Sequence, residues 1–83
     1  MNEVIKMIKN KEYNDAENKI EQALKLDTLD EKVKVKYYYL IALINSDYNN
    51  LNKNNSKAKR YIKLCINSKY VEESYYELYS RLE

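Results

Sequence analysis

The sequence predicts an all-α domain of about five short helices. The 83-residue chain contains no glycine and no proline, the residues that most often mark turns. Apolar residues make up 45% of the chain, which is enough to build a core. They recur three to four residues apart in five separate stretches, as helices with one buried face require. A chain of this length forms one domain, which here covers residues 1–83.

The first two helices are predicted before residue 25. Val4, Met7 and Ile8, with Ile5 beside them, indicate a short first helix. Residues 10–12 form a turn, in which Asn10 best tolerates a left-handed backbone. The second helix carries its apolar side chains on one face, at Tyr13, Ala16, Ile20, Ala23 and Leu24.

A third helix is expected after a capping-box pattern formed by Thr28 and Glu31. Its apolar stripe consists of Leu29, Val33, Tyr37, Leu40, Ile41 and Ile44. Within it, the segment KVKVKYYY (32–39) alternates as a β-strand would, which leaves a strand open as the alternative. We favour the helix, because a single strand would have no partner to pair with.

The asparagine-rich run NSDYNNLNKNNS (45–56) has no apolar periodicity and predicts a mobile loop, with Leu51 as its one possible anchor. A fourth helix follows, with Asn55 or Ser56 as its cap and with Ala58, Tyr61, Ile62 and Cys65 on its apolar face. Ser68 is expected to cap a fifth helix, whose apolar positions are Val71, Tyr75, Leu78, Tyr79 and Leu82.

The segment YNDAENKIEQALKLDTLD (13–30) alternates small and large apolar residues, and residues 56–67 repeat the spacing more weakly. The small residues are Ala16, Ala23, Ala58 and Cys65, which would let helices cross at short distance. This spacing resembles the second helix of a tetratricopeptide repeat. The resemblance implies two irregular helical hairpins, a C-terminal capping helix and a concave face that holds peptide segments or helices of other proteins.

The chain also departs from that family. Residues 1–11 barely carry the aromatic, leucine and glycine pattern of its first helix, and Thr28 occupies the place of its usual proline. Ala16 and Ala58 are 42 residues apart, against a family period of about 34. A plain helical bundle therefore remains the alternative.

The sequence offers no residues for catalysis, for a metal or for a cofactor. It has no histidine, and its one cysteine, Cys65, lies where a small core residue is expected. Without glycine the chain cannot form a glycine-rich phosphate loop. Its carboxylates are scattered along solvated helix faces. We therefore predict that the protein is not an enzyme.

The expected location is the cytoplasm, without a membrane partner. The first ten residues, MNEVIKMIKN, lack the apolar core of a signal peptide. The longest apolar run, 37–44, is much shorter than the roughly 20 residues of a membrane span. A lone cysteine makes no internal disulfide, which favours a reducing compartment.

Charge is unevenly distributed behind the net charge of +2. Residues 53–69 contain no acidic residue and six basic ones: Lys53, Lys57, Lys59, Arg60, Lys63 and Lys69. Residues 71–83 carry a net charge of −3, from Glu72, Glu73, Glu77 and Glu83 against Arg81. Either the acids of the last helix lie near a solvated basic face, or the basic residues bind an acidic protein surface or phosphates. The second interpretation assigns partner binding to Lys57, Lys59, Arg60 and Lys63.

Five of the ten tyrosines lie on the apolar stripes and are expected in the core: Tyr13, Tyr37, Tyr61, Tyr75 and Tyr79. Tyr38 and Tyr39 lie off the stripe, because neighbouring residues point about 100° apart on a helix. Exposed beside Lys32 and Lys36, they would form an amphipathic patch of the kind that protein interfaces favour. These four residues complete the predicted partner-binding set.

The predicted function is therefore that of a small helical module that docks on a larger protein partner, as an adaptor or as a stand-alone steric inhibitor. In size and composition the chain is similar to phage-encoded inhibitors of bacterial defence, including anti-CRISPR proteins. A homodimer is left open. The alternative is direct RNA or DNA binding through the basic segment 53–69, flanked by Tyr48, Tyr61 and Tyr70.

Overall fold

The computed structural model describes residues 2–82 and confirms the all-α fold with five helices. Their bounds are α1 Asn2–Lys9, α2 Tyr13–Leu24, α3 Glu31–Ser46, α4 Asn55–Ile66 and α5 Glu73–Leu82. Between residues 2 and 82 there is no strand, so the strand alternative for residues 32–39 is wrong.

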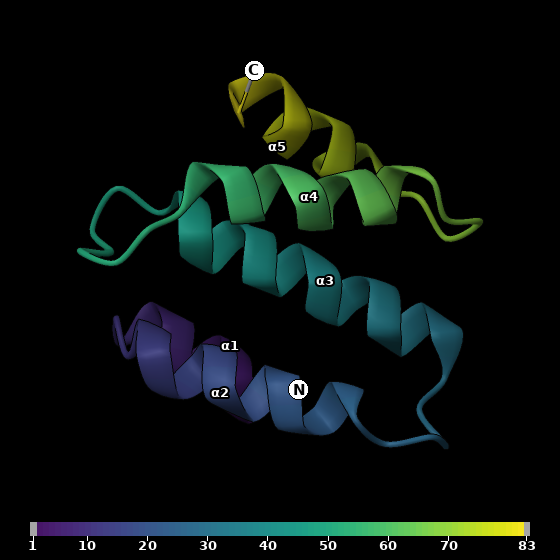
Figure 1. The fold of residues 1–83 in the computed structure, drawn as a ribbon, viewed down its shortest axis with the longest axis horizontal. Coiled ribbons are helices and arrows are strands. Elements are labelled where there is room, and N and C mark those ends of the chain that lie inside the picture. The colour runs from purple at the N-terminus through teal and green to yellow at the C-terminus, as the bar shows by residue number, and fades with distance from the viewer. Residues whose placement is uncertain (1, 83) are drawn as a thin grey trace.

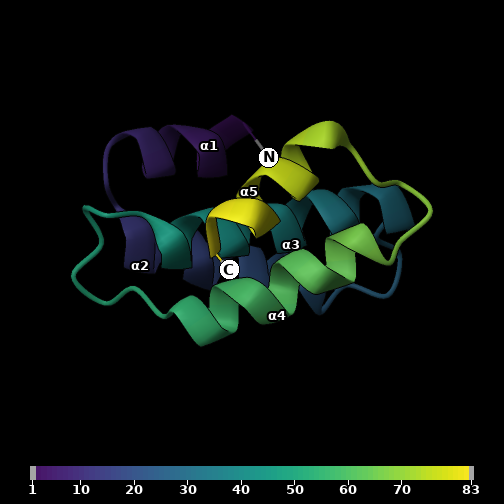
Figure 2. The same cartoon turned by 90° about the horizontal axis from the view of Figure 1, so that it is seen from above.

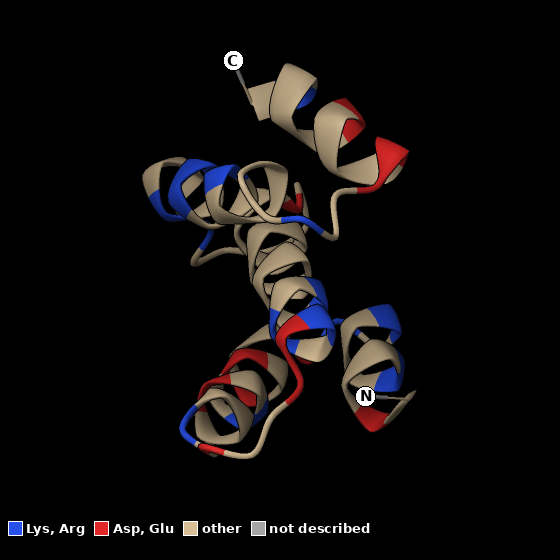
Figure 3. Cartoon of the chain, turned by 90° about the vertical axis from the view of Figure 1, so that its right-hand side faces the viewer, with Lys and Arg blue, Asp and Glu red and all other residues tan. Residues whose placement is uncertain are grey.

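Helix α3 runs through the centre of the molecule (Figure 1). Viewed from above and from the side, α1 and α5 lie on one side of α3, while α2 and α4 lie on the other (Figures 2 and 3). Consecutive helices run in opposite directions, so that the start of α2 lies near the end of α3 and the end of α4 lies near the start of α3.

Two hydrophobic clusters lie on opposite sides of α3. The first joins α1, α2 and α3 and is formed by Val4, Tyr13, Ala16, Ile20, Tyr37, Leu40, Ile41 and Ile44. The second joins α3, α4 and α5 and is formed by Val35, Ala42, Ala58, Ile62, Cys65, Tyr75 and Leu78. Val35 and Tyr37 belong to different clusters, because residues two apart on a helix point about 200° apart. The strand-like alternation in this segment is therefore the signature of a helix buried on two sides.

The small residues lie at packed positions, as predicted. Ala16, Ala58 and Cys65 have no exposed surface, whereas Ala23 is only partly buried. A side chain that stops at Cβ or Sγ lets a neighbouring helix approach closely, and a larger one at the same position would push the helix axes apart.

Two helix-end predictions are wrong for local reasons. Lys11, and not Asn10, takes the left-handed conformation after α1, with φ of 63°. Its N–H donates to the carbonyl of Ile8, and the N–H of Glu12 donates to that of Met7, the pair of bonds that defines a Schellman cap. At α3 the cap is Asp30, whose carboxylate accepts from the N–H of Lys32.

The caps of the last two helices also differ from prediction. Asn54 caps α4 by accepting from the N–H of Lys57, in place of Asn55 or Ser56. Ser68 does not cap α5, because its hydroxyl donates to the carbonyl of Cys65 and accepts from the N–H of Tyr70. Here Ser68 closes the turn after α4, and α5 begins at Glu73.

The loop after α3 is shorter than predicted and covers residues 47–54, because α3 continues to Ser46 and α4 begins at Asn55. Asn50 is buried, and its side-chain amide donates to the carbonyl of Ile44 at 2.8 Å. Leu51 is 99% exposed, so it is not an anchor. The mobility of this segment stays a prediction.

Candidate partner-binding groove

Two hollows follow one another along α3, on the side between α1 and α5. The first, of about 190 Å³, is lined by Ile5, Lys36, Tyr39 and Leu40. The second, of about 430 Å³, is lined by Ile8, Leu43, Ser46, Asp47, Tyr48 and Arg81. Together they define a surface that we call the α3 groove.

The floor and one wall of the α3 groove come from the helical periods of α3 and α1. Leu43 lies four residues after Tyr39 and three after Leu40, so it shares a side of α3 with both. Ile5 and Ile8 are likewise three residues apart on α1, and Ile5 remains 36% exposed beside the first hollow. The α3 groove therefore exposes aliphatic surface that the folded chain leaves partly uncovered.

Helix α5 supports the opposite side of the groove. The Tyr39 and Tyr75 rings pack with their centroids 4.8 Å apart. Tyr75 is buried, and burial raises the pKa of its hydroxyl, which lies 3.2 Å from a carboxylate oxygen of Glu72. This contact packs the Tyr39 side chain against α5, so α5 supports the aromatic part of the floor.

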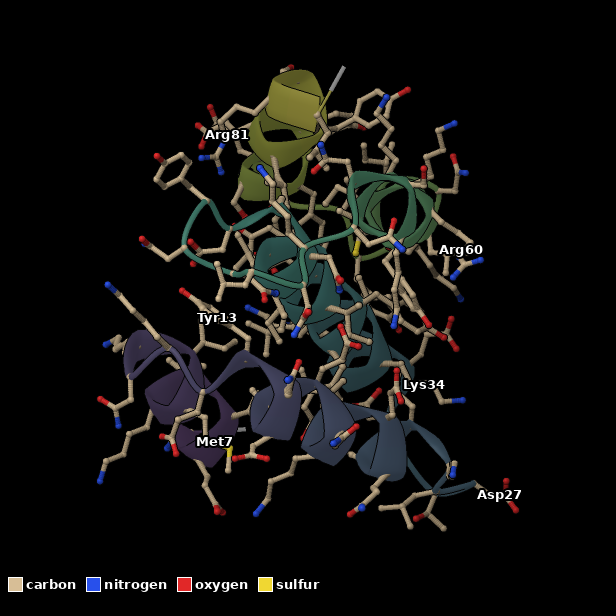
Figure 4. All side chains as sticks on the ribbon, turned by 60° about the vertical axis from the view of Figure 1, so that its left-hand side comes forward. Met7, Tyr13, Asp27, Lys34, Arg60 and Arg81 are labelled. Carbon is tan, nitrogen blue, oxygen red and sulfur yellow. The ribbon has the colours of Figure 1, made fainter. Side chains whose placement is uncertain are left out.

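Charged residues mark both ends of the α3 groove. At the first, the ammonium of Lys36 lies 3.2 Å from the carboxylate of Glu72, and this hydrogen bond lowers the pKa of Glu72. At the second, Asp47 accepts from the N–H of Asn49, which lowers its pKa, and from the Tyr13 hydroxyl at 2.8 Å. Arg81 lies on α5 beside this second end (Figure 4).

The structure separates the third-helix residues of the predicted partner-binding set. Lys36 and Tyr39 line the α3 groove, and Lys32 contributes to the field that lowers the pKa of Glu72 at its end. Tyr38 packs against α4 instead, with its ring centroid 5.7 Å from that of Tyr61. The expectation that both tyrosines are exposed is wrong, because each is partly buried against the second cluster.

The fourth-helix residues of that set also have different roles. Lys57 is partly buried and lies between α4 and α2, with its ammonium 2.9 Å from Glu17 and 3.4 Å from Glu21. Burial alone would lower the pKa of Lys57, but its hydrogen bonds to the two carboxylates outweigh this and raise it. Lys57 therefore links α4 to α2, and both of its ion-pair partners belong to the fold itself.

Lys59, Arg60 and Lys63 have no carboxylate within ion-pair distance in the part of the chain that the structure describes. Arg60 projects outward from α4 (Figure 4), and its guanidinium lies 5.6 Å from the centroid of the Tyr61 ring. Within residues 71–82, no acid forms an ion pair with these cations. Glu72 pairs with Lys36 of α3, Glu73 and Glu77 are exposed without an ion pair at these distances, and Glu83 lies outside the described residues.

Several residues of the α3 groove were not predicted from the sequence to bind a partner. Ile5, Leu43 and Arg81 belong to three different helices, and only the packing of α1 and α5 on one side of α3 brings them together. The sequence contains no motif that links them. Cys65 lies on the other side of α3, where burial raises the pKa of its thiol to about 12, so the neutral thiol persists at physiological pH.

In residues 2–82, no helix has the length and apolar character that crossing a membrane would require. Among the same residues, no three or more histidine, cysteine, aspartate or glutamate side chains are grouped so that they could hold a metal ion. Comparison with protein-family models, with curated proteins and with solved structures gives no match for this chain.

Proposed function

We propose that the protein is a non-enzymatic binding module whose α3 groove holds an amphipathic helix of a partner protein. The observation that carries the proposal is the succession of two hollows along one face of α3, with Ile5 and Ile8 on one side and Tyr39, Leu40 and Leu43 beneath. Apolar side chains of a partner would fill these hollows and remove the exposed aliphatic surface from water.

A helix fits this groove better than an extended peptide does. The groove is bounded by helices, whose backbone groups are already bonded within each helix except at the ends. An extended peptide would therefore leave its own backbone groups without partners, whereas a helix satisfies them internally.

The spacing of the hollows sets the register of the occupant. Lys36 and Leu43, which line the first and the second hollow, are seven residues apart on α3. At about 1.5 Å per residue this separation is roughly 10 Å. A partner helix that lies along α3 would therefore place apolar side chains at positions i and i+7 in the two hollows.

Such a module acts by occupying a surface, either to link the partner to another molecule or to block it. The partial tetratricopeptide resemblance supports this proposal, because modules of that family hold peptide segments and helices. The similarity in size and composition to phage-encoded inhibitors favours the blocking role, in which the partner is a larger protein of a defence system. In both roles the free energy of binding comes from the apolar groove.

The test compares Ile5→Glu with Val71→Glu, two substitutions at aliphatic residues whose side chains are almost equally exposed. Ile5→Glu places a charge in the first hollow, whereas Val71→Glu does so at a residue that lines neither hollow; the two side chains are 36% and 38% exposed. Partners captured from the source organism are quantified by mass spectrometry and titrated against both variants. We expect Ile5→Glu to weaken binding at least about tenfold and Val71→Glu to leave it within about twofold. Equal binding by the parent and Ile5→Glu would refute the groove proposal.

A further inference from the structure

The outward side of α4 is a cationic surface. We call it the α4 face and define it by the residues that point away from the core: Ser56, Lys59, Arg60, Lys63, Leu64 and Asn67. It contains no acidic residue, and the part of the α4 ribbon that carries basic residues lies at one edge of the molecule (Figure 3). It lies on the other side of α3 from the groove.

The fold itself leaves this surface positively charged. Glu17 and Glu21, the acids of α2 that reach α4, bind Lys57 instead of the cations of the α4 face. Glu72 binds Lys36. Three cations within two turns of one helix repel one another, and an external group of negative charge would relieve that repulsion.

Leu64 gives the α4 face an apolar centre. It is 47% exposed and lies four residues after Arg60, so the two side chains are neighbours on the helix surface. An apolar side chain beside a charged rim is the arrangement that protein interfaces use. Phosphate groups, which supply most of the attraction between a nucleic acid and a basic surface, are charged and would not cover Leu64.

We propose that the α4 face docks an acidic amphipathic helix of a partner protein. Carboxylates of that helix lie against Lys59, Arg60 and Lys63, and one of its apolar side chains covers Leu64. This surface is distinct from the α3 groove and does not depend on the function proposed for it. With both surfaces occupied, the protein would hold two segments on opposite sides of α3.

The charges beside the α4 face favour a narrow partner over a nucleic-acid duplex. Glu17 and Glu21 on α2, which pair with Lys57 of α4, both remain partly exposed. A helix about 10–12 Å in diameter covers α4 alone. A duplex, whose major groove alone is about 12 Å wide, would extend toward these acids, and its phosphates would be repelled by them.

The test uses fluorescence anisotropy with three labelled probes. The first is a helical peptide with glutamates at i, i+4 and i+7 and a leucine between them; the second replaces that leucine with alanine; the third is a short DNA duplex. The variant Lys59→Glu/Arg60→Glu/Lys63→Glu removes the cations of the α4 face. Its matched control, Lys6→Glu/Lys9→Glu/Lys25→Glu, changes three exposed lysines on α1 and after α2. Each set reverses three charges, so both change the net charge from +2 to −4.

We expect reversal on the α4 face to weaken binding of the leucine peptide at least about tenfold, and the control set to weaken it less than about threefold. Leu64→Ser should weaken the leucine peptide about fivefold and leave the alanine peptide unchanged, because only the first covers this position. Ile5→Glu should bind the leucine peptide as the parent does. Circular dichroism checks that each variant is folded, and glutamine replaces glutamate at the three positions if reversal unfolds the chain.

Four results would overturn the proposal. The first is absence of binding by the leucine peptide, and the second is an equal loss in the control set, which would show that only net charge matters. The third is tighter binding of the duplex with no effect of Leu64→Ser, which would assign the α4 face to nucleic acid. The fourth is loss of peptide binding in Ile5→Glu, which would place the peptide in the α3 groove.

Discussion

Lys57 and Glu17 join α4 to α2 through an ion pair of 2.9 Å between side chains that are 23% and 22% exposed. The same carboxylate group also accepts from the side-chain amide of Asn45 on α3, at 2.6 Å. Three helices therefore meet at Glu17. Partial burial makes this pair less open to screening than a surface ion pair.

Replacement of Lys57 by methionine should lower the free energy of unfolding by about 1–3 kcal/mol. Methionine keeps most of the apolar stem but leaves Glu17 partly buried without its cation. The matched control is Lys59→Met, at a residue without an ion-pair partner among the described residues, where we expect a change within about 0.5 kcal/mol. Urea unfolding followed by circular dichroism measures both. Equal stability of the two variants would contradict the bridging role of Lys57.

Ala16→Leu should destabilise the protein by about 1–3 kcal/mol. Ala16 has no exposed surface, so the added carbon atoms must displace neighbouring helices. Ala23→Leu should cost less, because Ala23 is only partly buried and the larger side chain can turn toward solvent. Thermal unfolding compares the two variants, and a larger loss for Ala23→Leu would show that the helices cross elsewhere.

Asn50→Ala should cost about 1–2 kcal/mol, although it lies in a loop. The Asn50 amide donates to the carbonyl of Ile44, and its side-chain oxygen accepts from the N–H of Asn52 at 3.0 Å. Leu51→Ala is the control and should be nearly neutral, because Leu51 is exposed. Chemical denaturation distinguishes the two. If Asn50→Ala is also neutral, the two side-chain hydrogen bonds of Asn50 do not contribute to the stability of the fold.

Acid should destabilise the protein through Asp47. Hydrogen bonding lowers the folded-state pKa of Asp47 below its ordinary value of 3.8. The stability that it contributes is therefore present above pH 3.8 and is lost as the pH falls through the folded-state pKa. Asp47→Asn should weaken this acid dependence, whereas Asp27→Asn, at an exposed turn residue (Figure 4), should not. The free energy of unfolding, measured from neutral pH to about pH 2, gives the two slopes. An unchanged slope in Asp47→Asn would contradict the prediction.

The spacing of the apolar residues was sufficient to predict the all-α class, the five helices and most of the buried side chains. The period of the apolar residues is a local property, and Ile20, Ile41, Ile62 and Leu78 are all buried where this period places them. Helix ends were less predictable. Thr28 and Asp30 are both good caps, and only the path of the chain into α3 decides which carboxylate or hydroxyl meets a free N–H.

Which surfaces are exposed depends on how the helices pack against one another. Lys57 and Arg60 stand in the same basic run, yet one is held between two helices and the other projects into solvent. Tyr39 lies off the main stripe, which predicts an exposed side chain. However, α3 is buried on two sides, and Tyr39 packs against the second cluster with its ring on that of Tyr75. The α3 groove likewise exists because α1 and α5, which are far apart in sequence, pack on the same side of α3. A sequence pattern gives the direction in which a side chain points from its own helix, whereas burial depends on which other helix lies in that direction.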